Sequence, residues 1–526
     1  RVLLDPNTMS KDGTVSLSSY VPSEDGRLLA YSISRGGSDW NEILVRDVET
    51  GKDLADHLKW IKFGGISWAK DGSGFYYSRY DAPVEGAALT QKNEFQKLCF
   101  HKIGAPQSED KVVYERKDHP KWGFGGDVTD DGRFLAIHMS EGTNPKNRFF
   151  YQDLSDSANP VVELLADADA SYNFIGNHGS DFYFLSDLDA PRRKVIAIDI
   201  TKPERKDWKT IVPETKDLLD DASLVGGKLV CTFMHDARNT VTVFDPKGMK
   251  LRDVDLPGIG SVGGFRGRDD DKSTFYSFTS FTDPGAIYQY DLETGTSKLW
   301  RKPKVDFKGE DYETRQEFIS SKDGTKVPVF IVCKKGITLD GSHRVLLTGY
   351  GGFNIPLTPA FSVGRAVWLE RGGVLAVANL RGGGEYGSEW HLAGTKLRKQ
   401  NVFDDFIAAG EWLVREKYTT PSRLSIQGGS NGGLLVGACL AQRPDLFGAA
   451  LPAVGVMDML RFHKFTIGWA WESDYGSAEK SDEFKALIKY SPYHVLKSGT
   501  RYPATMVTTA DHDDRVVPAH SFKFAA

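Results

Sequence analysis

The sequence predicts a multidomain protein in which a repetitive all-β half precedes an α/β half. Its 526 residues exceed what a single hydrophobic core organises, so at least two domains are expected. Short apolar and aromatic runs separated by glycine turns recur up to about residue 304, and beyond it strands alternate with helical patterns. We therefore expect one domain over residues 1–304 and a second over residues 305–526.

A strand–turn–strand unit recurs in the first half. Its turn markers stand 46, 60, 47, 48 and 44 residues apart, at Gly26, Gly72, Gly132, Gly179, Gly227 and Asp271. Repeats of roughly 40 to 50 residues are typical of four-stranded propeller blades. The alternative is a β-sandwich or an open β array, but an open array would leave long sheet edges unprotected. The spacing predicts a β-propeller with about six visible blades and room for a strand of another at the N-terminus, so we expect seven blades in the full protein.

The second half has a different pattern of predicted secondary structure. A hairpin is expected around residues 321–324, followed by buried strands at 345–347 and 373–378 and by a short strand at 424–427. Residues 403–415 carry apolar positions at helical spacing. Alternating strands and helices imply a largely parallel sheet with helices on both faces. This half is therefore expected to be an α/β domain.

Composition excludes several functional classes. A net charge of −5 gives no argument for a nucleic-acid partner, which would require a basic surface, and no apolar run approaches the roughly 20 residues of a membrane helix. The four cysteines are far apart and form no C-x-x-C pair, which argues against a disulfide framework or a zinc site. We expect no metal, no cofactor, no nucleic-acid partner and no membrane partner. A cytoplasmic location is favoured, with the periplasm as the alternative.

One motif carries chemistry directly. Gly428-Gly-Ser430-Asn-Gly432 fits G-x-S-x-G, with a strand before it and an apolar helical segment, 434–441, after it. This context is what a nucleophile elbow requires, because a tight turn lifts the serine oxygen out of the sheet and glycines tolerate the strained backbone. The pattern predicts that Ser430 is the nucleophile of a serine hydrolase on an α/β-hydrolase domain.

A serine nucleophile needs a base, a carboxylate that orients the base, and donors for the oxyanion. Residues 502–509 read as a strand, and three candidate carboxylates follow it, Asp511, Asp513 and Asp514; spacing alone does not choose among them. One oxyanion donor is expected to be the backbone N–H of Asn431. The second is expected from the loop at 349–353, where the Tyr350 hydroxyl is a candidate and a merely packed aromatic ring is the alternative.

Four segments together resemble the prolyl oligopeptidase family, which are propeller-capped serine peptidases of the α/β-hydrolase superfamily. They are 428–433, 350–354, the Arg-Gly-Gly-Gly-Glu-Tyr-Gly run at 381–387, and 510–518, and the resemblance extends over essentially the whole chain. The resemblance implies that Asp513 is the catalytic carboxylate and that Arg515 binds the substrate carbonyl next to proline. It also implies a proline pocket formed by Trp471, Tyr475, Phe353, Val456 and Val516.

The same resemblance implies a function. The implied protein is a serine endopeptidase that cleaves short peptides on the carboxyl side of proline through an acyl-enzyme. It is expected to act as a monomer, and its expected partners are short proline-containing peptides. Oligopeptidase B would need acidic residues to receive a basic side chain, whereas the pocket positions here are aromatic and aliphatic. A dipeptidyl peptidase would need a paired-glutamate anchor for a free amino terminus, and the sequence shows none.

The triad histidine is the departure from the family pattern. In the family it lies a few dozen residues beyond the aspartate, whereas this sequence ends at Ala526, 13 residues after Asp513. His512 and His520 are the only histidines nearby. The sequence, whose first five residues read as part of a strand, is therefore expected to be truncated at both ends. The alternative function is a catalytically incomplete fragment or a non-catalytic peptide-binding scaffold.

Overall fold

The computed structural model describes residues 1–156 and 158–526, which fold as two compact units. The first unit consists of residues 1–172 together with two later segments, 461–473 and 510–518. The second consists of residues 173–460, 474–509 and 519–526. The predicted boundary at residues 304/305 stays a prediction.

Three four-stranded antiparallel sheets make up most of the first unit, and each is a meander whose strands pair in chain order. The first sheet contains β1 (Val15–Pro22), β2 (Leu28–Arg35), β3 (Asn41–Asp47) and β4 (Asp53–Ile61). The second contains β5 (Ile66–Trp68), β6 (Gly74–Arg79), β7 (Lys97–Lys102) and β8 (Lys111–Tyr114). The third contains β9 (Trp122–Val128), β10 (Phe134–Glu141), β11 (Arg148–Asp153) and β12 (Val161–Leu165).

Three further sheets of the same design follow. They are formed by β13 (Tyr172–His178), β14 (Asp181–Ser186), β15 (Lys194–Asp199) and β16 (Lys209–Val212), then by β17 (Leu218–Val225), β18 (Lys228–His235), β19 (Arg238–Phe244) and β20 (Lys250–Asp253). The last contains β21 (Ser261–Arg266), β22 (Ser273–Thr279), β23 (Ala286–Asp291) and β24 (Ser297–Arg301). Six blade-like sheets are thus present among the described residues.

The repeat markers explain how each of these sheets begins. Every marker lies in the turn between the first and second strand of its sheet. The five glycine markers have φ between 59° and 71°, namely Gly26, Gly72, Gly132, Gly179 and Gly227. Glycine populates this left-handed region without the steric penalty that a Cβ brings, so the turns recur wherever a blade starts. The repeat predicted from the sequence therefore marks the blades.

Neighbouring sheets share cores. Ala30, Ile43 and Val45 of the first sheet form one buried cluster with Phe75 and Tyr77 of the second. Equivalent clusters join the second sheet to the third, the fourth to the fifth and the fifth to the sixth. Face-to-face packing of successive four-stranded sheets is the construction of a propeller.

A mixed seven-stranded sheet forms the core of the α/β half, in the order β25-β26-β28-β27-β29-β30-β31. The hairpin β25–β26 is antiparallel, as is the pairing of β26 with β28, and the remaining pairs are parallel. The strands are β25 (Tyr312–Ser320), β26 (Lys326–Lys334), β27 (Val345–Gly349), β28 (Val374–Ala378), β29 (Leu424–Gly429), β30 (Ala449–Ala453) and β31 (Ala504–Thr505). The β-propeller and α/β-hydrolase classes are both confirmed.

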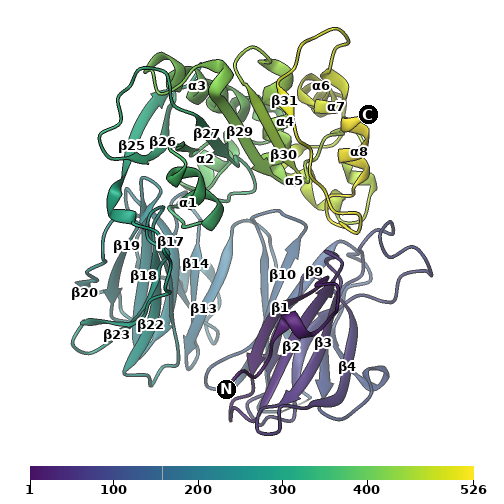
Figure 1. The fold of residues 1–526 in the computed structure, drawn as a ribbon. Helices are drawn as coiled ribbons and strands as arrows, with labels where there is room; N and C mark the ends of the chain where they lie inside the picture. The colour runs from purple at the N-terminus through teal and green to yellow at the C-terminus, as the bar shows by residue number, and fades with distance from the viewer. Residues whose placement is uncertain (157) are drawn as a thin grey trace. The chain divides into compact units, whose positions relative to one another are not determined.

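Eight helices accompany this sheet in the described part of the chain. They are α1 (Val363–Glu370), α2 (Ser388–Leu392), α3 (Gln400–Arg415), α4 (Asn431–Gln442), α5 (Glu472–Tyr475), α6 (Ser481–Tyr490), α7 (Pro492–Val495) and α8 (Ala519–Ala525). α4 is buried along nearly its whole length and packs on β29 and β30 (Figure 1). None of the helices described combines the length and apolar character needed to cross a membrane.

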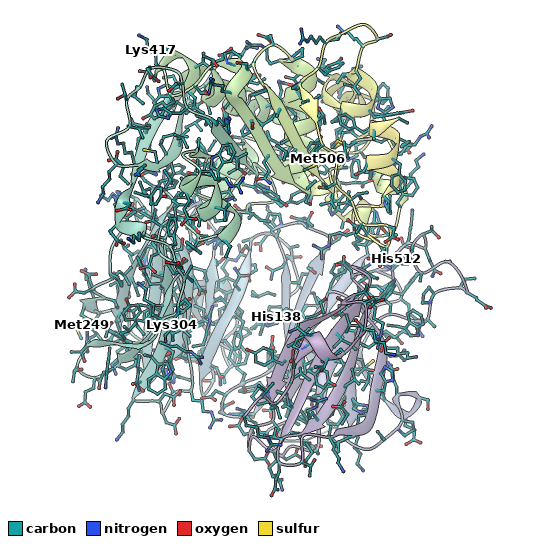
Figure 2. All side chains as sticks on the ribbon, in the orientation of Figure 1. His138, Met249, Lys304, Lys417, Met506 and His512 are labelled. Carbon is teal, nitrogen blue, oxygen red and sulfur yellow. The ribbon has the colours of Figure 1, made fainter. Side chains whose placement is uncertain are left out.

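Two local expectations differ from the structure. The strand predicted over 502–509 is shorter in the structure, where only β31 and an isolated bridge between Thr508 and Ala453 form. The reason is that β31 is an edge strand with a single neighbour. Met506, just after β31, is 57% exposed (Figure 2). Residues 1–5 form no strand, because the first sheet begins at Val15 and none of its strands pairs with them. Apolar sequence without a pairing partner does not make a strand.

Candidate active site

Ser430 stands at the junction between β29 and α4 in a strained conformation. Its φ is 57° and its ψ is −121°, a region that non-glycine residues rarely adopt. The strain is supported by hydrogen bonds: Ser430 N–H donates to the Ala453 carbonyl of the neighbouring strand at 2.9 Å, and the Ser430 carbonyl accepts from Gly433 N–H at 2.8 Å. This is the geometry of a nucleophile elbow.

The flanking glycines are required by space. A Cβ on Gly428 would lie 2.4 Å from the backbone oxygen of Gly432, and a Cβ on Gly433 would lie 2.5 Å from the Ala453 carbonyl oxygen. A side chain at Gly428 would push β29 and α4 apart, and one at Gly433 would push α4 away from the end of β30. The local sequence therefore folds into a sharp strand–turn–helix because only glycine permits the close backbone approach.

The loop after β27 lies beside this elbow. β27 is parallel to β29 and next to it, so the carboxyl ends of the two strands meet at one edge of the sheet. A Cβ on Gly432 would lie 3.6 Å from Cδ2 of Tyr350, which places the Tyr350 ring against the turn. Asn431 fixes the loop further, because its Nδ2 donates to the Tyr350 carbonyl at 2.5 Å.

Three of the predicted pocket residues lie in the same unit as Ser430. The rings of Phe353 and Tyr475 meet edge-to-face with centroids 5.2 Å apart. Tyr475 and Val456 are buried, and the Tyr475 hydroxyl donates to Oδ1 of Asn431 at 2.9 Å. Burial raises the pKa of Tyr475 well above its ordinary value, so its phenol remains a neutral donor. The structure thus brings Ser430, Asn431 and this aromatic pair into one connected cluster.

The other predicted residues lie in the first unit. Oδ1 of Asp513 accepts the backbone N–H groups of Arg515 and Val516, both at 3.0 Å. Burial raises the pKa of Asp513, and those two backbone donors oppose the increase. The carboxyl group is therefore held by its own turn, with one oxygen engaged by the backbone.

Arg515 and Asp514 are both paired within the first unit. The Arg515 guanidinium donates to both carboxylate oxygens of Asp39, at 2.6 and 2.7 Å. Asp514 is fully buried and accepts from Lys62 Nζ at 2.9 Å, where Lys62 is also 0% exposed. These contacts tie the segment 510–518 to the first sheet.

Trp471 and Val516 complete the predicted set. Both are buried in the first unit, and the Trp471 ring stacks on Phe462 with an interplanar angle of 20°. The predicted site residues are therefore divided between the two units.

Neither nearby histidine has the environment of a general base. His520 is 2% exposed, and its Nδ1 accepts the backbone N–H of Asp458 at 3.1 Å. Burial lowers the pKa of His520 to about 4, far from the value near neutrality that suits general-base catalysis. His512, labelled in Figure 2, is exposed and pairs with its sequence neighbour Asp511 at 2.8 Å.

Two protein-family models match most of this chain. The model of the prolyl oligopeptidase N-terminal β-propeller domain matches residues 1–303, and that of the prolyl oligopeptidase family matches residues 359–526. The chain belongs to the prolyl oligopeptidase family. The chain is therefore a serine peptidase.

Individual relatives agree. The chain is 47% identical over 526 residues to a prolyl endopeptidase of Elizabethkingia meningoseptica, covering 100% of this chain and 74% of the relative. A solved structure from a study of two prolyl endopeptidases superposes with a TM-score of 0.95 at 42% identity, covering 100% of this chain and 77% of the other. Prolyl oligopeptidase B of Galerina marginata, solved with a bound 35mer substrate, has a TM-score of 0.93 at 35% identity, covering 99% and 74%.

Sequence reasoning missed the residues that support the site. One group is a buried network of Asp474, Lys399 and His391, which lies behind the loop at 349–353 that carries Tyr350 (the Tyr350 loop). The other group is Lys62 and Asp39, which bind the segment 510–518. Each pair joins residues far apart in the chain, so spacing gives no signal for them. Among residues 1–156 and 158–526, no group of three or more histidine, cysteine or acidic side chains is placed to hold a metal ion.

Proposed function

We propose that this chain carries the acyl-transfer site of a serine endopeptidase that cleaves short peptides on the carboxyl side of proline. The observation that carries the proposal is the strained Ser430 turn, with Tyr350 packed against it at the carboxyl ends of the parallel strands β27 and β29. Ser430 Oγ attacks the carbonyl carbon of the proline residue, and its proton passes to a histidine base. The amine half of the peptide leaves with that proton, and water then releases the acyl group.

The negative charge that develops on the carbonyl oxygen requires donors already in place. We assign these to the Asn431 backbone N–H, at the start of α4, and to the Tyr350 hydroxyl. The Asn431 side chain supports this role, because it bonds to the Tyr350 carbonyl and so couples the two donors to each other.

Asp513 is assigned as the carboxylate that orients the base. Its Oδ1 is occupied by two backbone N–H groups, and its second oxygen is proposed to accept the imidazole N–H. Arg515 is assigned to the substrate carbonyl next to proline. It is paired with Asp39 and 56% exposed, so a substrate carbonyl would have to share or displace that pairing.

The pocket is assigned to proline because its predicted lining is aromatic and aliphatic. A rigid pyrrolidine ring fits a flat apolar slot, and the edge-to-face pair of Phe353 and Tyr475 provides one wall. Trp471, Val456 and Val516 are assigned to the remaining lining. All five positions lack the acidic groups that a basic side chain would need.

The proposed organisation is a β-propeller over residues 1–304 and an α/β-hydrolase domain over residues 305–526. The match of the propeller family model to residues 1–303 supports this boundary. We further propose a monomer of the cytoplasm that acts on short proline-containing peptides, as the peptide-bound structure of the Galerina relative supports for the substrate class.

The test compares Ser430→Ala with the unchanged protein, both expressed from the natural gene. A peptide with a chromogenic group after proline is the substrate, and the same peptide with arginine in place of proline is the control. We expect Ser430→Ala to lower kcat by about 10⁴-fold or more and to abolish labelling by a fluorophosphonate. Equal turnover by both proteins, or faster cleavage after arginine, would contradict the proposal.

A further inference from the structure

A network of buried ionisable side chains lies behind the Tyr350 loop. Asp474 is 1% exposed, Lys399 is 0% exposed and His391 is 4% exposed. They come from α5, from the residue before α3, and from α2, so three separate helical segments converge on one point. Charged groups are rarely buried so completely unless they are paired and hydrogen-bonded, which makes their partners informative.

Two of the partners are backbone groups of the loop. Lys399 Nζ donates to the Gly351 carbonyl at 2.9 Å, and Oδ1 of Asp474 accepts the Phe353 N–H at 3.0 Å. The two contacts lie on either side of Gly352. The loop between Tyr350 and the pocket residue Phe353 is therefore held by a positive group and a negative group at adjacent peptide units.

The three side chains also hold one another. Lys399 Nζ lies 3.3 Å from Oδ2 of Asp474, and His391 Nε2 lies 2.7 Å from Oδ1. A carboxylate only accepts hydrogen bonds, so His391 donates through Nε2. Burial would raise the pKa of Asp474, but Lys399 and His391 outweigh it and lower the pKa below its ordinary value. Asp474 is thus ionised in the folded protein.

The loop needs this support because its backbone is strained. Gly351, Phe353 and Asn354 have φ of 65°, 57° and 57°. A left-handed conformation is unfavourable for residues that carry a Cβ, and it persists only where the surroundings over-determine it. The Phe353 N–H that Asp474 accepts belongs to one of the two strained residues. The buried carboxylate is the group placed to maintain the strain.

A second path connects the network to the serine turn. The Lys399 ammonium lies over the Tyr475 ring at 5.2 Å, the Tyr475 hydroxyl donates to Asn431, and Asn431 donates to the Tyr350 carbonyl. The loop is therefore fixed at three successive peptide units, through Tyr350 O, Gly351 O and Phe353 N.

We infer that Asp474, held by Lys399 and His391, is a positioning residue that sets the Tyr350 hydroxyl and the Phe353 ring relative to Ser430. This inference rests on the proposed function, in which Tyr350 donates to the oxyanion. Asp474 touches no reacting atom; it acts through the loop backbone. A group that positions an oxyanion donor affects the transition state more than the bound substrate, so kcat responds more than KM.

The test is a double-mutant cycle on the protein expressed from its natural gene, with Asp474→Asn and Tyr350→Phe. Asparagine keeps the shape of the side chain but removes the charge that pairs with Lys399. We expect Asp474→Asn to lower kcat by about 10- to 100-fold with less than about a threefold change in KM. Tyr350→Phe should lower kcat by about 100-fold in the unchanged protein and by less than about tenfold in the Asp474→Asn protein.

The matched control is Asp458→Asn, which removes another buried carboxylate paired to a lysine, Lys523, in the same unit. Asp458→Asn should leave the effect of Tyr350→Phe at its full size. If Asp474→Asn does not fold, the cycle is run with Lys399→Met/Asp474→Asn, which leaves no lone buried charge. A Tyr350→Phe effect of equal size with and without Asp474 overturns the inference. Activity that survives Ser430→Ala would instead overturn the proposed function.

Discussion

The buried pair of Asp514 and Lys62 lets a stability prediction be worked out from the structure. Both side chains are 0% exposed, and Asp514 accepts from Lys62 Nζ at 2.9 Å, Ser38 Oγ at 3.1 Å and Asp39 N–H at 2.8 Å. Removing one member of such a pair leaves a buried charge unpaired and destabilises by about 3–5 kcal/mol. Asp514→Asn should therefore release the segment 510–518 from the first sheet.

The assay is hydrogen exchange at the Arg515 and Val516 amides, which donate to Asp513 inside that segment. About 3–5 kcal/mol corresponds to a loss of protection of roughly a hundredfold to several thousandfold. Burial already lowers the pKa of Lys62, and losing the Asp514 charge lowers it further. Because the unfolded chain then binds the extra proton, the deficit should be larger at about pH 6 than at about pH 9.

The paired variant Lys62→Met/Asp514→Asn is the control. It removes both charges and fills the lysine volume with an apolar side chain, so protection should return to within about tenfold of the unchanged protein. If Asp514→Asn and the double variant lose the same protection, the two charges are not coupled and the reasoning is wrong. Activity should follow the same order, because Asp513 and Arg515 flank the residue that is changed.

Three other predictions follow from particular contacts. His101 lies buried between Asp110 at 2.7 Å and Asp56 at 3.0 Å, and these hydrogen bonds overcome burial and raise its pKa above 6.5. Its stabilisation is present below pH 6.5 and is lost as pH rises through the folded pKa. His101→Gln should therefore lower Tm below pH 6.5 and remove its share of the decline in Tm that begins above pH 6.5, as thermal unfolding across pH would show. Burial raises the pKa of Glu385 from 4.5 to about 7, so its ionisation should destabilise the fold by about 3 kcal/mol above pH 7, and Glu385→Gln should raise Tm there and not at about pH 4. Gly428→Ala places a Cβ 2.4 Å from a backbone oxygen four residues later and should lower kcat by about 100-fold or more, whereas a kcat within threefold would refute the close-approach argument.

The blades and the serine turn could be predicted from sequence because both are local. Gly26 and the other four glycine markers occupy turns whose backbone favours glycine. Gly428-Gly-Ser430 directly joins the end of β29 to the start of α4, so the strand, the turn and the helix are all visible in one short stretch of sequence. The edge strand β31 could not be bounded, because its length depends on a single neighbour, β30, more than 50 residues earlier. The residues that support the site could not be predicted from the sequence either, because they pair over long distances in the chain. Lys399, for example, binds Asp474, which lies 75 positions later.

The two buried ion pairs serve the same purpose in different units. Lys399–Asp474 binds backbone groups of the loop that carries Tyr350, and Lys62–Asp514 anchors the turn that carries Asp513 and Arg515. A buried pair contributes little net stability compared with apolar residues of the same size, so stability does not explain why charges stand there. What they provide is direction, because a carboxylate holds a specific N–H and an ammonium a specific carbonyl, while an apolar contact tolerates a shift of an ångström. Replacing either pair by apolar residues should therefore leave Tm nearly unchanged but lower kcat, whereas each single variant should lower both Tm and kcat.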